Sequence, residues 1–249
     1  MRLLLYLYRK LLAMKTLLSL LSFLITLTLY SQKTIDVGKN DLPNTSGSLY
    51  AVGGQPFANY KYVKVMEGTP YFKEEWMGGK VIMSGGFAYD SIYLRLDLME
   101  NSLHYIGPDG QEMIANSPIR GIILADSVTG KKYRFVNADY LQVTGKIAPG
   151  WYQMLDTGQV TLYKKFLKVI NESRPYGSAT TEQRIATMGQ YFLMINSVFT
   201  PVKKIKEIPD LLPDKKEELK AYISLKNLSG KNDADYSALI SYYNSIVAK

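Results

Sequence analysis

The stretch Ser91–Leu98 (SIYLRLDL) indicates most directly which fold this chain adopts. Its apolar residues recur at every second position and alternate with one aromatic and two charged residues: Ile92, Leu94, Leu96 and Leu98 against Tyr93, Arg95 and Asp97. A period of two is typical of a β-strand with one side on a hydrophobic core and the other in water. The stretch therefore predicts an antiparallel sheet that is wet on one face.

The sequence on either side predicts more strands, joined by short turns. We expect them at Tyr60–Met66, Lys80–Met83, Ser102–Ile106, Ile119–Ala125, Lys131–Val136, Gly150–Leu155 and Gln159–Val169. The intervening segments supply turn residues, as in Pro108-Asp109-Gly110, where proline presets φ and glycine accepts a positive φ angle. Successive hairpins of this kind predict a β-meander curled into a sandwich or a half-barrel.

The last seventy residues carry helical patterns and one more strand. Thr180–Met188 opens with the spacing of a capping box and predicts a short helix, which a buried strand at Tyr191–Phe199 follows. We then expect a helical turn or two at Lys203–Ile208, a helix from its cap at Asp214 to about Asn227, and a last helix at about Asp233–Val247. The expected fold class is therefore α+β, an antiparallel β-meander followed by two or three C-terminal helices.

Residues 1–31 have the pattern of a secretory signal peptide. Lys15 precedes an uncharged apolar run, Thr16–Leu29, and we expect cleavage shortly after it, behind residue 31. Met14 is the expected start, which makes residues 1–13 an upstream extension, whereas a start at the first residue would permit an uncleaved membrane anchor. The run is shorter than the roughly 18–20 residues that span a bilayer, so we expect no transmembrane span in the mature protein.

A cleaved leader predicts an exported protein, located in the periplasm, on the outer membrane or outside the cell. The rest of the chain divides by composition into a polar lead-in at 32–55, an antiparallel β domain at 56–200 and a helical tail at 201–249 that packs on it. This length is enough for one good hydrophobic core.

The composition excludes several chemistries. The chain has no cysteine and a single histidine, His104, which removes thiol nucleophiles, thiolate metal sites and every site that needs two imidazoles. Four cations of the leader supply half of the net charge of +8, and no later stretch combines clustered Lys and Arg with aromatics. We therefore expect no nucleic-acid partner, no metal and no cofactor.

Four phrases, in this order, resemble a widespread group of uncharacterised exported proteins of Gram-negative bacteria: GTPYFKEEWMGGKVIMSGG at Gly68–Gly86, YDSIYLRLDL at Tyr89–Leu98, GWYQMLDTGQVTLYKK at Gly150–Lys165 and ALISYYNSI at Ala238–Ile246. The resemblance extends over most of the chain after the leader. It implies a bacterial, exported, single-domain protein of strands and helices, and it implies no activity, ligand or catalytic residue.

Aromatic residues are the candidate binding residues. Trp76 follows two acids, and a carboxylate beside an indole can form a sugar-binding face, in which the ring stacks on the sugar and the acid accepts its hydroxyl hydrogens. Tyr93, Tyr133 and Trp151 lie on expected strands. If they share an exposed face, they form a platform for a glycan or a peptide; otherwise they stabilise the packing between strands.

Three carboxylates are the weak catalytic candidates, Glu74, Glu75 and Asp97, since paired carboxylates cleave glycosidic bonds. The alternative for Asp97 is a solvated ion pair with Arg95, two residues away on the same face. For His104 we expect a surface or hydrogen-bonded position on a strand rather than a role as ligand or base.

The sequence thus favours an exported cell-envelope protein that works as a non-catalytic binding or structural module, with an envelope glycan, a lipid or another envelope protein as its partner. Two alternatives remain. A hydrolase acting on envelope polysaccharide would show two carboxyl groups in one cleft. A carrier of an apolar ligand would show an apolar cavity of a few hundred Å³.

Overall fold

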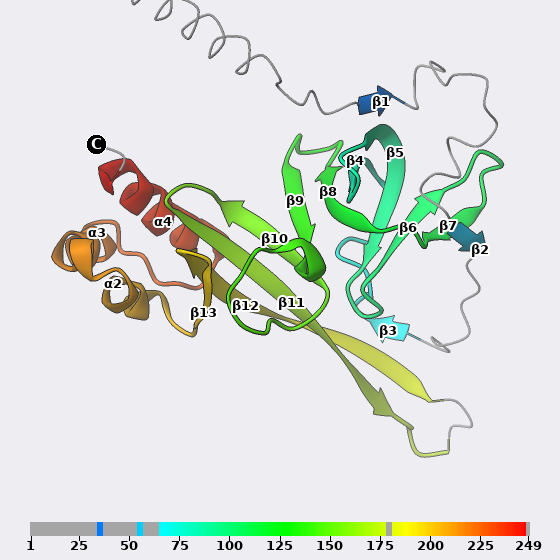
Figure 1. Ribbon diagram of the computed structural model, residues 1–249. Helices are drawn as coiled ribbons and strands as arrows, with labels where there is room; N and C mark the ends of the chain where they lie inside the picture. The colour runs from blue at the N-terminus through cyan, green and yellow to red at the C-terminus, as the bar shows by residue number, and fades with distance from the viewer. Residues whose placement is uncertain (1–33, 37–53, 57–64, 178–180, 248–249) are drawn as a thin grey trace, which may run out of the picture. The chain divides into compact units, whose positions relative to one another are not determined.

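The computed structural model describes residues 34–36, 54–56, 65–177 and 181–247 (Figure 1). The predicted signal peptide and its cleavage point lie outside the described residues, as do most of the predicted lead-in and the predicted strand at Tyr60–Met66 up to residue 64. The described residues form an open, mostly antiparallel sheet followed by three α-helices, which confirms the α+β class.

The strands are β1 (Thr34–Asp36), β2 (Gly54–Pro56), β3 (Val65–Glu67), β4 (Met77–Met83), β5 (Ala88–Asp97), β6 (Ser102–Ile106), β7 (Glu112–Ala115), β8 (Ile119–Ala125), β9 (Lys132–Asn137), β10 (Trp151–Asp156), β11 (Val160–Ser173), β12 (Glu182–Ile195) and β13 (Val198–Val202). Their order in the sheet is β13-β12-β11-β10-β9-β8-β4-β5-β6-β7-β2, while β1 and β3 pair in parallel with β5 and β12. Two meanders, β4–β7 and β8–β13, are thus joined by an antiparallel ladder between β4 and β8.

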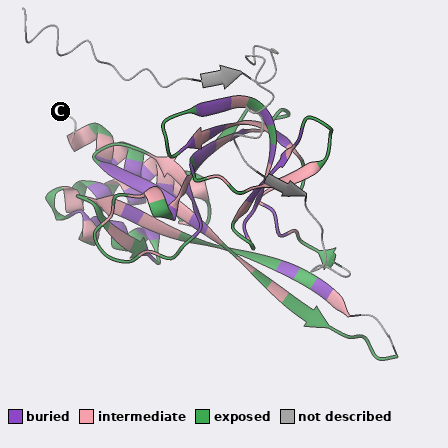
Figure 2. Cartoon of the chain, turned by 45° about the vertical axis from the view of Figure 1, so that its right-hand side comes forward, coloured by how far each residue is buried: buried purple, intermediate pink, exposed green. Residues whose placement is uncertain are grey.

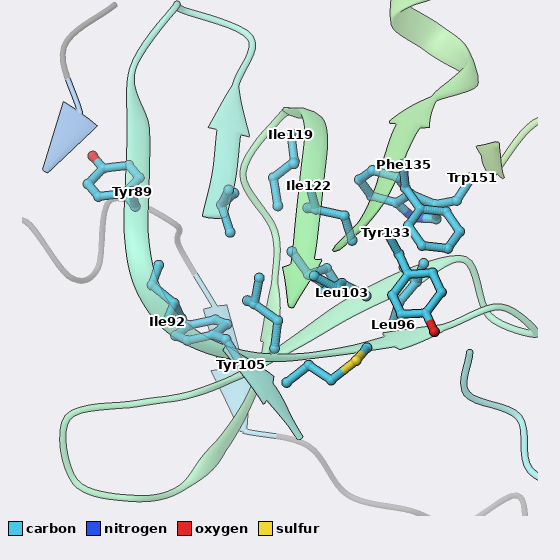
Figure 3. Close-up of a cluster of buried hydrophobic side chains, with 14 of the residues drawn as sticks. Tyr89, Ile92, Leu96, Leu103, Tyr105, Ile119, Ile122, Tyr133, Phe135 and Trp151 are labelled. Carbon is cyan, nitrogen blue, oxygen red and sulfur yellow. The ribbon is translucent and has the colours of Figure 1, made fainter. Parts of the chain in front are cut away.

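The first meander and the start of the second bend around their own side chains. The ladders of β4 with β5 and with β8 contain register shifts, at Gly79–Val81 and at Ile82–Met83 respectively. Such bulges bend a strand and increase its twist. Figure 3 shows the result: side chains of β5, β6, β8 and β9 point toward one another inside the bend. This part of the sheet is closer to the expected half-barrel than to a sandwich.

The side chains inside the bend form the first core. Ile92, Leu94 and Leu96 of β5 are buried there, whereas Tyr93 between them is 61% exposed, as the alternation predicts. Phe72, which lies before β4, packs against this core. Its ring centre lies 4.9 Å from the ring centres of Tyr133 and of Phe135, with edge-to-face geometry in both pairs.

The second core lies between the other end of the sheet and the helices α2 (Ile208–Leu211), α3 (Lys216–Leu225) and α4 (Asp233–Val247). Leu162 and Leu193 of the sheet are buried against Leu219, Leu239 and Ile240 of the helices. The bounds of α4 are those that its apolar stripe predicts, and its position covers that stripe.

Three local predictions in the C-terminal part are wrong. The single strand expected at Tyr191–Phe199 is the end of β12, a turn at 196–197 and the start of β13. The helix expected at Thr180–Met188 is not found in the described residues, because β12 occupies the segment from Glu182 and pairs with β11 from Ile195 opposite Val160 to Glu182 opposite Ser173. A capping-box spacing contributes little compared with a ladder of this length. Asp214 does not cap α3, which begins at Lys216 without a side-chain cap. The carboxylate of Asp214 instead accepts a hydrogen bond from the hydroxyl of Tyr243 at 3.1 Å.

Candidate functional site

A cleft of about 410 Å³ opens at one end of the first core. Its walls come from the β5–β6 turn and the start of β6, from the β7–β8 connection, and from the segment that links β9 to β10. Most of its lining side chains carry hydrogen-bonding groups: Asn101, Ser102, Asn116, Ser117, Asn137, Asp139 and Tyr140, beside Leu103, Ile114, Ala115, Pro118, Ile119 and Trp151. We call it the polar cleft.

Trp151 and Gly150 join two walls of the polar cleft. The indole Nε1 of Trp151 donates a hydrogen bond to the backbone carbonyl of Asn101 at 3.1 Å, and the ring is buried in the first core. Gly150 has a φ angle of +110° and lies against the side-chain amide of Asn101, where a Cβ atom would collide with it. Because only glycine adopts this conformation without strain, the position of the β5–β6 turn depends on this residue.

The third wall contains a short 3-10 helix, Ala138–Tyr140. Asn137 caps the start of this helix. The side-chain oxygen of Asn137 accepts a hydrogen bond from the backbone N–H of Asp139 at 3.1 Å. The carboxylate of Asp139 is exposed, and Tyr140 is half-buried beside it. Among the described residues that line the polar cleft, Asp139 is the one carboxylate, and the lining includes no histidine.

A polar cluster on β5, β6 and β7, in which His104 is buried, reaches the wall of the cleft through Ser102. One carboxylate oxygen of Glu112, Oε1, accepts a hydrogen bond from Arg95 Nη2 at 2.8 Å and lies 2.6 Å from His104 Nδ1. The other ring nitrogen of His104 lies 3.0 Å from the hydroxyl of Ser102, a residue of the cleft wall. His104 is therefore buried and hydrogen-bonded at both ring nitrogens, and its contacts hold the start of β6 in place.

Two aromatic rings cover Arg95. Its guanidinium carbon lies 4.0 Å from the ring centre of Tyr71 and 4.4 Å from that of Trp76. Burial raises the pKa of Tyr71 to about 12, and the charges of Glu112 and Asp97 add to this, although that of Arg95 opposes it. The phenol therefore stays neutral at ordinary pH, and Trp76 packs on a cation instead of lining the polar cleft.

The three weak catalytic candidates do not line the polar cleft. Glu74 and Glu75 lie exposed on the segment before β4, whereas Asp97 is only 1% exposed. Its Oδ1 accepts hydrogen bonds from the backbone N–H groups of Met99 and Glu100, both at 2.8 Å. Burial raises the pKa of Asp97, and these hydrogen bonds lower it. The expected solvated pair with Arg95 is wrong, because Asp97 holds the β5–β6 turn and Arg95 pairs with Glu112.

The four candidate aromatics do not share one exposed face. Trp76 is half-buried and Tyr93 is exposed, whereas Tyr133 and Trp151 belong to the first core. Trp151 alone of the four lines the polar cleft. Sequence reasoning missed the polar residues of the cleft because they follow no periodicity. Their only signal is asparagine in three separate loops, in ENS at 100–102, ANS at 115–117 and NADY at 137–140.

Comparison of the chain with models of protein families, with curated proteins and with solved structures gives no match. In the part of the chain that the structure describes, no helix is long and apolar enough to cross a membrane. Over the same residues, no group of three or more His, Asp or Glu side chains is placed to hold a metal ion.

Proposed function

We propose that this chain is a non-catalytic binding module of the cell envelope and that the polar cleft holds its ligand, a hydroxyl-rich glycan. One observation carries the proposal: amide, hydroxyl and carboxylate side chains from three separated loops meet around one cleft. Its volume of about 410 Å³ is within the range of about 300–1,000 Å³ that small-molecule sites occupy.

The chemistry of the lining favours a sugar over an apolar ligand. Asparagine amides such as those of Asn101 and Asn116 offer a donor and an acceptor side by side, which suits neighbouring hydroxyl groups. Asp139 adds an acceptor for hydroxyl hydrogens, and Tyr140 adds both a ring and a hydroxyl group. A carrier of an apolar ligand would need the opposite lining, because a polar group loses its hydrogen bonds to water when an apolar ligand covers it.

The same lining favours binding over hydrolysis. Glycoside cleavage needs two carboxyl groups about 5 to 9.5 Å apart, and Asp139 is the one carboxylate among the described residues of this cleft. Asp97 is engaged by the backbone amides of its own turn, and neither Glu74 nor Glu75 lines the cleft.

The proposed location follows from the apolar leader and from the resemblance to exported proteins. We expect the mature chain to begin at residue 32 and to lie in the periplasm or on the outer surface. Cell fractionation with sequencing of the mature N-terminus tests this, and an uncut chain in the cytosolic fraction would contradict it.

Trp151 provides a direct test of binding. The chain has two tryptophans, so the Trp76→Phe variant leaves Trp151 as the sole indole, at the wall of the polar cleft. We expect its fluorescence to change and saturate on titration with muropeptides released from peptidoglycan or with oligosaccharides released from lipopolysaccharide. Asn116→Ala and Asp139→Ala should each weaken this binding about tenfold, the usual effect of losing one or two hydrogen bonds to a ligand.

Asn171→Ala is the matched control, because Asn171 is exposed on β11 and does not line the polar cleft. We expect it to bind as the parent does. Saturable binding that Asn116→Ala and Asp139→Ala leave unchanged would contradict the site, and no binding of either glycan class would contradict the proposed ligand.

A further inference from the structure

The hairpin of β11 and β12 extends well beyond the strands beside it (Figure 1). β10 pairs with β11 only between Leu162 and Lys165, and β13 pairs with β12 only from Tyr191 onward. We call the remaining outer part, Phe166–Ser173 with Glu182–Gly189, the arm. Figure 2 shows that exposed residues dominate the arm, whereas buried and half-buried ones make up the root of the hairpin.

The arm has an unpaired edge. Within the described residues, no strand pairs with Phe166–Ser173 on the side that faces away from β12. The N–H and C=O groups of such an edge are a template for another strand. On one face of the arm, Leu167, Val169 and Met188 are 39%, 41% and 54% exposed. The short strand β3 pairs with β12 at Gln183 and Arg184, so the open edge of the arm is that of β11, where a further strand would add a ladder.

We propose that a second copy of this chain supplies that strand: β11 pairs antiparallel with β11 of the second copy, about a two-fold axis at Ile170. The axis stands perpendicular to the sheet and therefore keeps every side chain on its own face. It places Lys168 opposite Glu172 of the second copy, Ile170 opposite Ile170 and Val169 opposite Asn171. The interface is isologous, as most dimer interfaces are.

Charge complementarity selects this partner and this register. Lys168 and Glu172 lie on the same face of β11, two residues on either side of Ile170. Within one chain they do not pair with each other: Lys168 Nζ donates to the hydroxyl of Thr187 at 2.9 Å and lies in the electrostatic range of Asp97 and Glu74, whereas Glu172 Oε1 accepts from Gln183 Nε2 at 2.8 Å. The two-fold axis at Ile170 brings each cation opposite an anion, twice in the dimer. An axis at Asn171 would instead place Lys168 opposite Arg174, which repels it.

A single cysteine at the axis tests the geometry. The chain has no cysteine, so Ile170→Cys can form a disulfide only with the same position of another copy. Opposite residues of an antiparallel pair have Cα atoms about 4.5–5.5 Å apart, within the range of about 4.4–6.8 Å that disulfides bridge. We expect rapid covalent dimers of Ile170→Cys under mild oxidation. Val128→Cys, on the β8–β9 loop and 92% exposed in the parent, should cross-link only slowly.

A charge swap tests the register. Glu172→Lys places two lysines opposite each other at both ends of the pairing, so it should weaken the dimer about tenfold in sedimentation equilibrium. Lys168→Glu should weaken it similarly, and the double variant should restore the parent value. Lys226→Glu, at an exposed position after α3, is the charge-matched control and should leave the dimer unchanged. If circular dichroism shows that Lys168→Glu misfolds, Glu172→Lys and Ile170→Cys still test the proposed pairing of β11 with β11.

Three results would overturn the proposal. The parent chain would sediment as a monomer at every concentration, which is also the result expected if the arm pairs with a strand of another protein. Ile170→Cys would cross-link no faster than Val128→Cys. The dimer would form but would not respond to the charge swap, which would locate its interface elsewhere.

Discussion

The two cores of this sheet are covered in different ways. In the first core, β4 to β9 bend around their own side chains, and bulges in β4 permit the bend. In the second core, the ladder of β11 and β12 runs without a register shift, and helices cover its face instead. The difference indicates that local ladder geometry decides whether a sheet closes on itself or needs a separate layer to bury its apolar side.

The two cores also use polar side chains differently. Behind the first core, Arg95, His104 and Glu112 form one connected cluster on three neighbouring strands. At the second core, a polar cluster instead links a helix to the sheet: Asp233 of α4 pairs with Lys164 of β11 at 2.7 Å and accepts a hydrogen bond from the hydroxyl of Tyr191 of β12. The first cluster therefore fixes neighbouring strands relative to one another, and the second fixes a helix on the sheet.

The largest expected effects come from leucines buried in each core. Leu94→Ala in the first core and Leu239→Ala in the second should each lower the free energy of unfolding by about 2–5 kcal/mol, because both side chains are fully buried. We expect one cooperative urea transition in both variants, measured by circular dichroism and tyrosine fluorescence together. Separate transitions in Leu239→Ala would show that the helices unfold independently of the sheet.

Asn244 of α4 offers a narrower test of the second core. Its side-chain oxygen accepts from the backbone N–H of Val160 at 2.9 Å, and its amide nitrogen donates to the carbonyl of the same residue at 2.9 Å. Asn244→Ala leaves the backbone N–H and C=O of the buried Val160 without these hydrogen bonds. We therefore expect the free energy of unfolding to fall by about 2–3 kcal/mol. Hydrogen exchange at the Val160 amide should accelerate. An unchanged exchange rate would mean that the helix does not protect this edge.

Gly150 tests the link between the first core and the polar cleft. Gly150→Ala should cost about 1–3 kcal/mol, since alanine is strained at its positive φ angle and its Cβ would displace Asn101. It should also weaken glycan binding. Gly110→Ala is the control: its φ angle is +79° with open space around it, so it should cost about 1–2 kcal/mol and leave binding intact. Equal effects of Gly150→Ala and Gly110→Ala on glycan binding would contradict the role of Gly150 in the cleft.

The smallest effect concerns Asp97. Because burial raises its pKa above the ordinary value of 3.8, the folded state holds this proton more tightly than the unfolded state does. The resulting stabilisation is complete below pH 3.8 and is lost as the pH rises through the raised pKa. Asp97→Asn keeps an acceptor for the two backbone amides and carries no charge, so at pH 7 its free energy of unfolding should equal or exceed that of the parent.

Urea unfolding of the parent and of Asp97→Asn between pH 3 and 7 checks this prediction. The parent should lose stability relative to the variant as the pH rises through that window. A variant that is clearly less stable at pH 7 would mean that the charge of Asp97 is needed in the fold.

Several elements could be predicted because their signal is local. The expected bounds of β6, β8 and α4 are those found, since each segment has its own alternation or its own apolar stripe. The helix expected at Thr180–Met188 was wrong because β11, a separate segment earlier in the chain, provides a strand partner from Glu182 onward. Asp97 is buried although its strand position predicts exposure, because the β5–β6 turn folds its amides over the carboxylate.

The sequence by itself determined the α+β class, most of the strands and the absence of thiol chemistry, because alternation, turn residues and composition act within a few positions of each other. Tertiary structure alone decided the pairing of β4 with β8, the burial of Trp151 and Tyr133, and the meeting of Asn101, Asn116 and Asp139 around one cleft. These features depend on contacts between segments far apart in the chain, and such contacts form only when the sheet bends and brings its loops together.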